Sequence, residues 1–210
     1  MKNMKGLDAP VKRVTVALTV AALFQAGSAL AALELRDLAG NATAITADAE
    51  FAYDTVLDAT WYLTANNTGL SWDNAKSWAS GLTVGTFSGW SLPSADPACG
   101  AFNCTNSQMG ELYYTALGNP AGGPLSNTGP FKNLQSNDYW SGTEYAPSPD
   151  LAWDFNTNNG NQNAFTKSTG LYALAVRPGD VAAVPEPGMV ALLLSGLAGV
   201  MVMRRRPVGS

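Results

Sequence analysis

The 210-residue sequence contains no histidine, only two cysteines and few basic residues. Without histidine the chain cannot form a Ser-His-Asp or Cys-His catalytic group, and the usual histidine ligands of zinc are missing. Seven of the twelve basic residues lie near the two ends, so residues 32–187 contain five basic against fifteen acidic residues, a net charge near −10. Such an acidic segment repels phosphate backbones, and we expect no nucleic-acid partner.

The C-terminal part of the chain has three features in a fixed order. Pro185-Glu186-Pro187 cannot continue a strand or helix, because proline fixes φ and lacks an N–H donor. Gly188 to Met203 is a run of sixteen residues without a charge, and Arg204-Arg205-Arg206 follows it. As a helix this run would be about 24 Å long, short for a hydrocarbon core of about 30 Å but sufficient for a temporary span. The arginines predict that this end stays in the cytoplasm.

This order of features resembles the PEP-CTERM sorting signal. The resemblance implies that an exosortase-type enzyme recognises and removes the segment, which we assign to residues 184–207. Before processing, the apolar part would act as a short transmembrane helix in the inner membrane. An ordinary C-terminal membrane anchor is the alternative. The residues of the sorting motif are Pro185, Glu186, Pro187, Arg204, Arg205 and Arg206.

A second apolar segment lies at the N-terminus. Four basic residues precede the eleven-residue run Val14 to Phe24, which is too short for a lasting membrane span. Ala29-Leu30-Ala31 follows, with small residues at Ala29 and Ala31 as at a signal-peptidase site. We therefore predict a secretory signal peptide over residues 1–31 rather than a buried N-terminal helix. The basic residues are Lys2, Lys5, Lys12 and Arg13.

The two cysteines, Cys99 and Cys104, are separated by four residues. Export would place them in an oxidising compartment, which favours a local disulfide bond between them. A reactive cysteine pair is the alternative, but it would need an activating base that the sequence does not offer.

Residues 32–183 have the length of one domain, and their apolar pattern predicts an α+β fold. We expect strands at Phe51–Asp54 and Thr60–Leu63, with a turn at Asn66–Gly69. Ser71 is expected to cap a helix, since Trp72, Ala75, Trp78, Ala79 and Leu82 follow at helical spacing.

The second half of this domain begins with another expected helix. Thr105 and Gln108 have the spacing of a capping box, and Gly118 fits the stop position. Trp90–Pro93 is expected as a short strand. Four further strands should then pair with their neighbours as an antiparallel meander. They are Tyr139–Tyr145, Leu151–Phe155, Gln162–Ser168 and Leu171–Val176.

Eight short motifs follow one another through this domain. They are Tyr53-Asp54, Thr60-Trp61, Trp72 with Ala75 and Trp78, Trp90-Ser91-Leu92-Pro93, Asn103-Cys104-Thr105, Met109-Gly110-Glu111-Leu112-Tyr113, Tyr139-Trp140-Ser141 and Ala175-Val176-Arg177-Pro178. The set resembles the Lcl C-terminal domain family, found at the end of a collagen-like bacterial adhesin. That family is similar to C-type-lectin-like domains, which implies two helices packed on twisted antiparallel sheets. Many members carry arginine where this chain has Ser91, and the resemblance supplies no catalytic mechanism.

The polar residues Asp154, Asn156 and Asn158 are the candidate ligand-binding residues, because strand alternation places them on one side. A calcium loop of the EF-hand type is the alternative there. Its register fails, since Phe165 stands where a bidentate glutamate is required. We therefore expect no metal and no cofactor. Trp140 and Trp153 could stack on sugar rings, but core packing is favoured.

These observations predict an exported, non-catalytic protein of a Gram-negative cell envelope or extracellular matrix, which binds or associates with exopolysaccharide. Two alternatives stay open. One is a glycan hydrolase that uses carboxylates among Asp138, Glu144, Asp150 and Asp154. The other is a purely structural coat protein.

Overall fold

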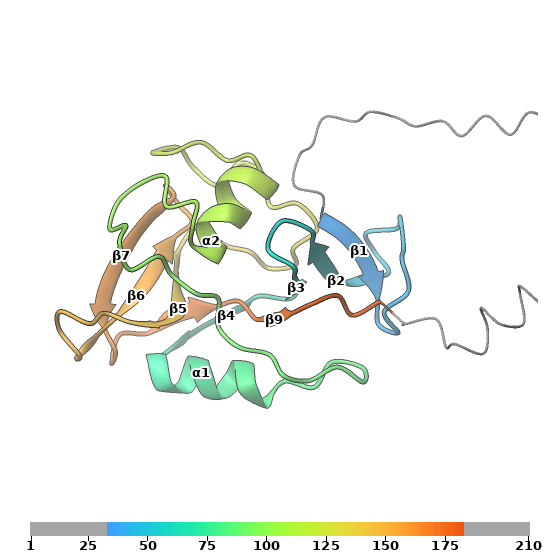
Figure 1. The fold of residues 1–210 in the computed structure, drawn as a ribbon, viewed down its shortest axis with the longest axis horizontal. Coiled ribbons are helices and arrows are strands. Elements are labelled where there is room, and N and C mark those ends of the chain that lie inside the picture. The colour runs from blue at the N-terminus through green and yellow to red at the C-terminus, as the bar shows by residue number, and fades with distance from the viewer. Residues whose placement is uncertain (1–32, 183–210) are drawn as a thin grey trace, which may run out of the picture.

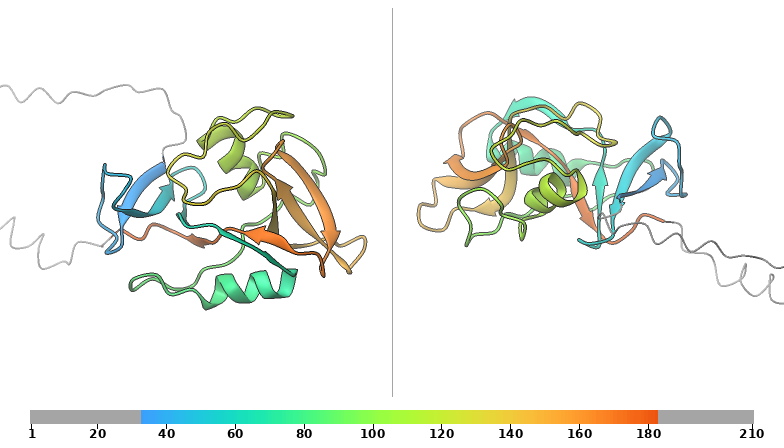
Figure 2. Two further views of the ribbon diagram at one scale, coloured as in Figure 1. Left: turned by 180° about the vertical axis from the view of Figure 1, so that it is seen from behind. Right: turned by 90° about the horizontal axis from the view of Figure 1, so that it is seen from above.

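The computed structural model describes residues 33–182, which form an α+β domain of two sheets and two short helical segments (Figure 1). One helical segment lies on one side of the sheets and the other on the opposite side, as Figure 2 also shows. The predicted α+β class is therefore confirmed. The signal peptide and the apolar C-terminal segment lie outside the described residues. Within residues 33–182, no helix is long and apolar enough to cross a membrane.

The first sheet brings together both ends of the described chain. Its strands are antiparallel in the order β1 (Leu33–Asp37), β2 (Ala49–Asp54), β3 (Ala59–Tyr62) and β9 (Val176–Pro178). Arg36 of β1 pairs with Asp180 just beyond β9, with 2.6 Å between Nη2 and Oδ2. Both ends of the described range consequently lie at the same end of the domain (Figure 1).

The second sheet has five strands in the order β4 (Asn66–Leu70), β8 (Leu171–Ala173), β5 (Asp138–Glu144), β6 (Leu151–Asn156) and β7 (Asn161–Thr166). The strands β5, β6 and β7 form the predicted antiparallel meander. The next strand, β8, does not pair with β7 as expected. It enters between β4 and β5 and runs parallel to β5.

Two helical segments cover the sheets. The helix α1 (Trp72–Gly81) begins directly after Ser71, as predicted, and buries Trp72, Ala75 and Ala79. The second segment consists of α2 (Gln108–Gly110), which continues into the π-helical turn η1 (Glu111–Ala116). It ends before Gly118, whose φ of +68° suits glycine at a helix C-terminus, in agreement with the predicted stop.

Two hydrophobic clusters occupy opposite faces of the strands, because neighbouring strand residues point to opposite sides. Tyr139 of β5 packs with Trp61 and with Leu112 of the second helical segment. Its neighbour Trp140 packs on the other face with Phe51 and with Trp72 of α1. The core packing expected for Trp140 is therefore confirmed.

The structure corrects four local predictions. Asn66–Gly69 is part of strand β4 rather than a turn, because the chain pairs there with β8. The expected strand Leu171–Val176 is divided between β8 and β9, which belong to different sheets. Trp90–Pro93 is not a regular strand and makes only an isolated bridge through Ser91 to Val176.

The fourth correction concerns the start of the second helical segment. Its N-cap residue is Ser107 rather than Thr105, and the Ser107 hydroxyl accepts a hydrogen bond from the N–H of Gly110 at 3.0 Å. Gln108 does not complete a capping box, since its Oε1 accepts from the N–H of Ser94 at 2.8 Å. A long-range contact thus replaces the predicted local one.

Candidate functional site

Cys99 and Cys104 form the predicted disulfide bond, with 5.6 Å between their Cα atoms. The bond closes a loop that leads into the second helical segment. The carbonyl of Cys104 accepts hydrogen bonds from the N–H and the hydroxyl of Ser107, the N-cap residue. The backbone of Gly110 lies so close to this carbonyl that a Cβ atom there would approach its oxygen to 2.0 Å. The disulfide loop and the helix start therefore form one tightly packed unit.

The three predicted ligand-binding residues do not share an exposed face. Asp154 is completely buried in the sheet. Asn156 is half-buried, and its Oδ1 accepts the N–H of Asn158 at 2.8 Å to stabilise the turn after β6. Only Asn158 is exposed. The prediction of one polar surface formed by all three residues is wrong, because β6 is buried on both faces along most of its length.

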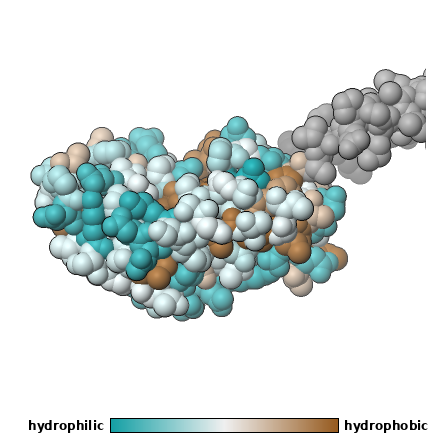
Figure 3. Space-filling view, turned by 90° about the horizontal axis from the view of Figure 1, so that it is seen from below, coloured by the Kyte–Doolittle hydropathy of each residue, from teal (hydrophilic) through white to brown (hydrophobic). Residues whose placement is uncertain are grey.

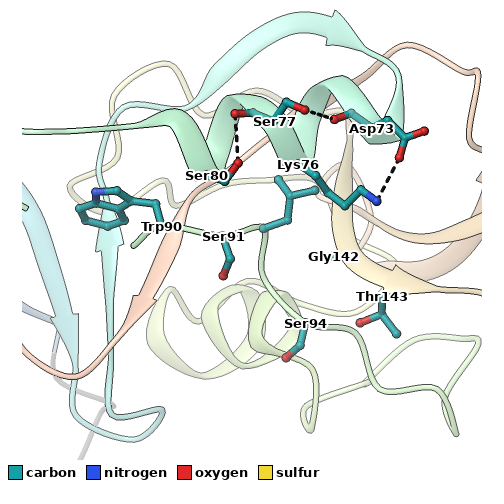
Figure 4. A pocket seen from close by; sticks show the side chains of 10 residues that line it. Asp73, Lys76, Ser77, Ser80, Trp90, Ser91, Ser94, Gly142 and Thr143 are labelled. Carbon is teal, nitrogen blue, oxygen red and sulfur yellow. Dashed lines mark hydrogen bonds and ion pairs between the residues drawn. The ribbon is translucent and has the colours of Figure 1, made fainter. Parts of the chain in front are cut away.

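An open groove lies between α1, the segment Trp90–Ser94 and the Gly142–Thr143 part of β5 (Figure 4). Its volume of about 660 Å³ lies within the range of small-molecule sites. The lining residues are Asp73, Lys76, Ser77, Ser80, Trp90, Ser91, Leu92, Ser94, Gly142 and Thr143. Figure 3 views the domain from the side of α1 and shows large polar areas on this face.

The segment after α1 forms one wall of the groove, and its residues alternate between buried and exposed. Trp90 and Leu92 are buried, and the Trp90 ring stacks on Phe51 with 5.6 Å between the ring centroids. Ser91 lies between them and is exposed, while its backbone exchanges two hydrogen bonds of 2.9 Å with Val176. The buried neighbours therefore hold the Ser91 hydroxyl at the groove surface.

Helical spacing places two further hydroxyls on the opposite wall. Ser77 and Ser80 are exposed on α1, and each donates a hydrogen bond to a backbone carbonyl three or four residues earlier. A hydroxyl has one hydrogen and two lone pairs, so these oxygens can still accept hydrogen bonds from a ligand. Thr143 contributes a hydroxyl from β5, which accepts the N–H of Ala95 at 3.0 Å. The groove is thus rich in fixed hydroxyl groups.

The charged residues of the groove compensate each other. Lys76 Nζ lies 3.0 Å from Asp73 Oδ1 and 3.4 Å from the centroid of the Trp72 ring. Asp73 is the one carboxylate among the groove residues. The site therefore presents hydroxyls and one closed ion pair rather than a surplus charge.

A smaller hollow of about 300 Å³ lies beside the disulfide loop and contains two aromatic rings. Trp153 and Tyr145 pack edge to face, with 4.9 Å between ring centroids. Trp153 is only 6 % exposed, so most of its ring surface serves packing, as predicted. Gln162 supports the hollow, because its side-chain amide donates to the carbonyls of Asp96 and Cys99.

The acidic residues proposed for hydrolysis are not gathered in the groove. Glu144 pairs with Lys167 and Asp150 is exposed in a turn, whereas Asp138 and Asp154 lie in the sheet. A second carboxyl pair, Asp54 and Glu111, was not singled out from the sequence as a site. Both residues are buried, and neither lines the groove.

Residues 33–182 contain five basic side chains. Four of them contact carboxylates, whereas Arg177 lies over the rings of Phe87 and Trp90. The ion pairs are Arg36 with Glu34 and Asp180, Lys76 with Asp73, Lys132 with Glu50, and Lys167 with Glu144. This arrangement leaves the excess negative charge of the domain unbalanced.

These features define a disulfide-bonded α+β domain with a hydroxyl-lined surface groove. Residues 50–177 match the Lcl C-terminal domain, and the chain belongs to this family. The match runs from the second residue of β2 to the second residue of β9 and includes both helical segments and the whole groove. No curated protein matches the sequence.

Proposed function

We propose that this protein is an exported, non-catalytic polysaccharide-binding domain that uses the groove beside α1. The observation that carries this proposal is the groove itself, an open hollow of about 660 Å³ whose walls expose the hydroxyls of Ser77, Ser80, Ser91 and Ser94. The hydroxyls of Ser77, Ser80 and Ser91 already donate to backbone carbonyls, so their oxygens are available to accept hydrogen bonds from the hydroxyls of a sugar. Such an open site stays wet and forms part of its contacts through water.

The charge distribution supports a neutral rather than an acidic polysaccharide. Bound polyanions usually contact free arginine or lysine side chains. Four of the five basic side chains of residues 33–182 already pair with carboxylates, and the fifth, Arg177, does not line the groove. Lys76, the one basic residue of the groove, is neutralised by Asp73. A net charge near −10 over residues 32–187 repels a polyanion further.

A shallow site of this kind predicts weak binding of each sugar segment. We expect a dissociation constant between about a micromolar and a millimolar for one site. The overall affinity should be higher when many copies of the protein bind along one polymer. This suits a protein that is retained in a matrix, where many weak contacts act together.

The two ends of the chain support the location. We propose that the signal peptide exports the protein across the inner membrane of a Gram-negative cell, and that an exosortase-type enzyme then removes the PEP-CTERM segment at Pro185-Glu186-Pro187. The disulfide bond suits an oxidising compartment. The likeness of the family to C-type-lectin-like domains is part of the same proposal, because two helical segments on opposite sides of antiparallel strands agree with it.

The direct test is retention of the protein on the exopolysaccharide of the producing cell. Tyrosine at Ser91 or Ser80 should fill the groove and abolish retention, since both side chains are exposed and tolerate a larger residue. The matched control is Ser88→Tyr, an exposed serine outside the groove that should leave retention unchanged.

The same experiment separates the alternatives. A hydrolase would generate new reducing ends in the retained polysaccharide, whereas a binding domain leaves it unchanged. A structural coat protein would show no retention by the folded protein in any variant.

A further inference from the structure

Four shielded oxygen atoms on β5, β6 and β7 have no hydrogen-bond donor among residues 33–182. They are Oδ1 of Asp138, both carboxylate oxygens of Asp154 and Oδ1 of Asn161. Asp154 is completely buried, so both of its oxygens have lost their hydration without gaining a donor from the described chain. A buried carboxylate in this state is strongly unfavourable unless a proton or a cation compensates it.

The strand register places the three residues on one face of the sheet. Asp138 of β5 lies opposite Asn156 of β6, and Asn156 lies opposite Asn161 of β7. Asp154 is two residues before Asn156 and therefore points to the same face. Neighbouring strands are about 4.8 Å apart, so side chains from three strands can converge above the central one. Burial raises the pKa of Asp154, and the charge of Asp138 and a hydrogen bond to it raise that pKa further.

A shared proton cannot satisfy this group of oxygens. One proton shared by the two aspartates accounts for two of the four oxygens, because one oxygen carries the proton and the other accepts the hydrogen bond. The other oxygen of Asp154 and the amide oxygen of Asn161 would still have no donor. The pair Asp54 and Glu111 has three such oxygens rather than four and no third side chain beside it in this state, because Oδ1 of Asp54 already accepts the N–H groups of Val56 and Leu57.

We propose that Asp138, Asp154 and Asn161 bind a divalent cation of the calcium type and thereby cross-link β5, β6 and β7. Carboxylate and amide oxygens are the ligands that calcium prefers, and its coordination number of six to eight leaves places for water. No group of three or more Asp, Glu, His or Cys residues that could hold a metal ion occurs in residues 33–182, and the proposed third ligand is therefore the amide oxygen of Asn161, which has no donor. Two carboxylates predict a weak site, with a dissociation constant of about 0.1 to 1 mM, as in extracellular calcium-binding modules.

This site differs from the EF-hand loop that the sequence first suggests. The ligands come from three strands rather than from consecutive loop positions, and Asn158 points into the exposed turn instead. The site is also separate from the groove, because none of its three residues lines that hollow.

Terbium luminescence tests the site directly. Trp140 lies opposite Asp154 on the same face, so excitation of tryptophan should sensitise a Tb³⁺ ion bound there. We expect emission from the full chain, purified in a mild detergent and freed of metal with a chelator, and we expect added Ca²⁺ to displace it. Asp154→Asn should lose this emission, whereas Asp150→Asn, an exposed aspartate in the turn after β5, should retain it.

Thermal unfolding gives an independent readout. Saturating Ca²⁺ should raise the unfolding midpoint of the chelated protein by about 3 to 8 °C, since the cation binds the folded state only. Asn161→Ala removes one neutral ligand and should weaken Ca²⁺ binding about tenfold, which keeps the test decisive where Asp154→Asn does not fold. Absence of both Tb³⁺ emission and a Ca²⁺-dependent midpoint in the wild-type protein would overturn the proposal. So would undiminished Ca²⁺-displaceable emission in folded Asp154→Asn.

Discussion

The carboxyl group of Glu111 is buried beside that of Asp54, although the two residues are 57 positions apart in the chain. Burial raises the pKa of Glu111 to about 8, and the hydrogen bond to Asp54 contributes further. A protonated Glu111 can donate to Oδ2 of Asp54, whose Oδ1 is held by the turn between β2 and β3. The pair thus joins the first sheet to the second helical segment through one proton.

This pair predicts that stability depends on pH. Because the folded state holds the Glu111 proton up to about pH 8 while the unfolded chain releases it near pH 4.5, the free energy of unfolding should fall as pH rises between these values. The slope from this group is at most about 1.4 kcal/mol per pH unit. Urea unfolding across this range should show a flatter profile for Glu111→Gln, whose amide can still donate to Asp54. Glu144→Gln, at a partly exposed ion pair, is the control and should keep the wild-type slope.

Gly110 predicts a marked loss of stability on substitution. A Cβ atom there would lie 2.0 Å from the Cys104 carbonyl oxygen and 2.7 Å from the Ser107 hydroxyl. We expect Gly110→Ala to destabilise the domain by about 1 to 3 kcal/mol, because the disulfide loop would have to move. The matched variant is Gly81→Ala in α1, where a Cβ meets nothing within 4 Å. It should be neutral or stabilise by about 0.5 to 1 kcal/mol, and equal losses in both variants would contradict the packing described.

The disulfide bond should contribute modestly to stability. Its loop is short, so the chain-entropy model gives only about 2 kcal/mol. We expect Cys99→Ser with Cys104→Ser to lower the free energy of unfolding by about this amount in urea unfolding. Thiol labelling of the unreduced native protein should find no free cysteine, and two reactive thiols would refute the bond.

The proposed processing at both ends predicts the mass of the mature protein. The form recovered from the cell surface should begin at Ala32 and end near Pro187, apart from any group added during processing. Mass spectrometry of the intact protein measures this. Recovery of a mature form that retains Arg204, Arg205 and Arg206 would contradict the sorting signal.

Local patterns in the sequence predicted much of the fold. The spacing from Trp72 to Ala79 indicated α1, and Gly118 marked the end of the second helical segment. The separation of the cysteines and the expected export indicated the disulfide. These features depend on neighbours within one turn of helix or one short loop, and such neighbours are visible in the sequence.

Features that depend on distant pairing could not be predicted in this way. The placement of β8 beside β5 depends on contacts of β8 with β4 and α1. The capping box predicted for Gln108 was wrong, because the side chain of Gln108 binds the distant backbone of Ser94 instead. The burial of Asp154 could not be predicted for the same reason. Strand alternation indicates that Asp154, Asn156 and Asn158 point to one side of the strand, but not whether the rest of the chain packs on that side.

The groove is the clearest case of this limit. The three-residue spacings of Ser77 with Ser80 and of Ser91 with Ser94 were available as signals. The position of Thr143 in the groove could not be predicted from the sequence, because it depends on the packing of Gly142 of β5 against the segment after α1.

The affinity for neutral oligosaccharides prepared from the producer's own exopolysaccharide tests the central claim most directly. Titration calorimetry should give a dissociation constant between about a micromolar and a millimolar for the wild-type protein. Ser91→Tyr should weaken binding at least about tenfold, equivalent to about 1.4 kcal/mol, while Ser88→Tyr should bind like the wild type. Equal binding by the wild type and folded Ser91→Tyr, or no binding by either, would contradict the assignment of the groove as a polysaccharide site.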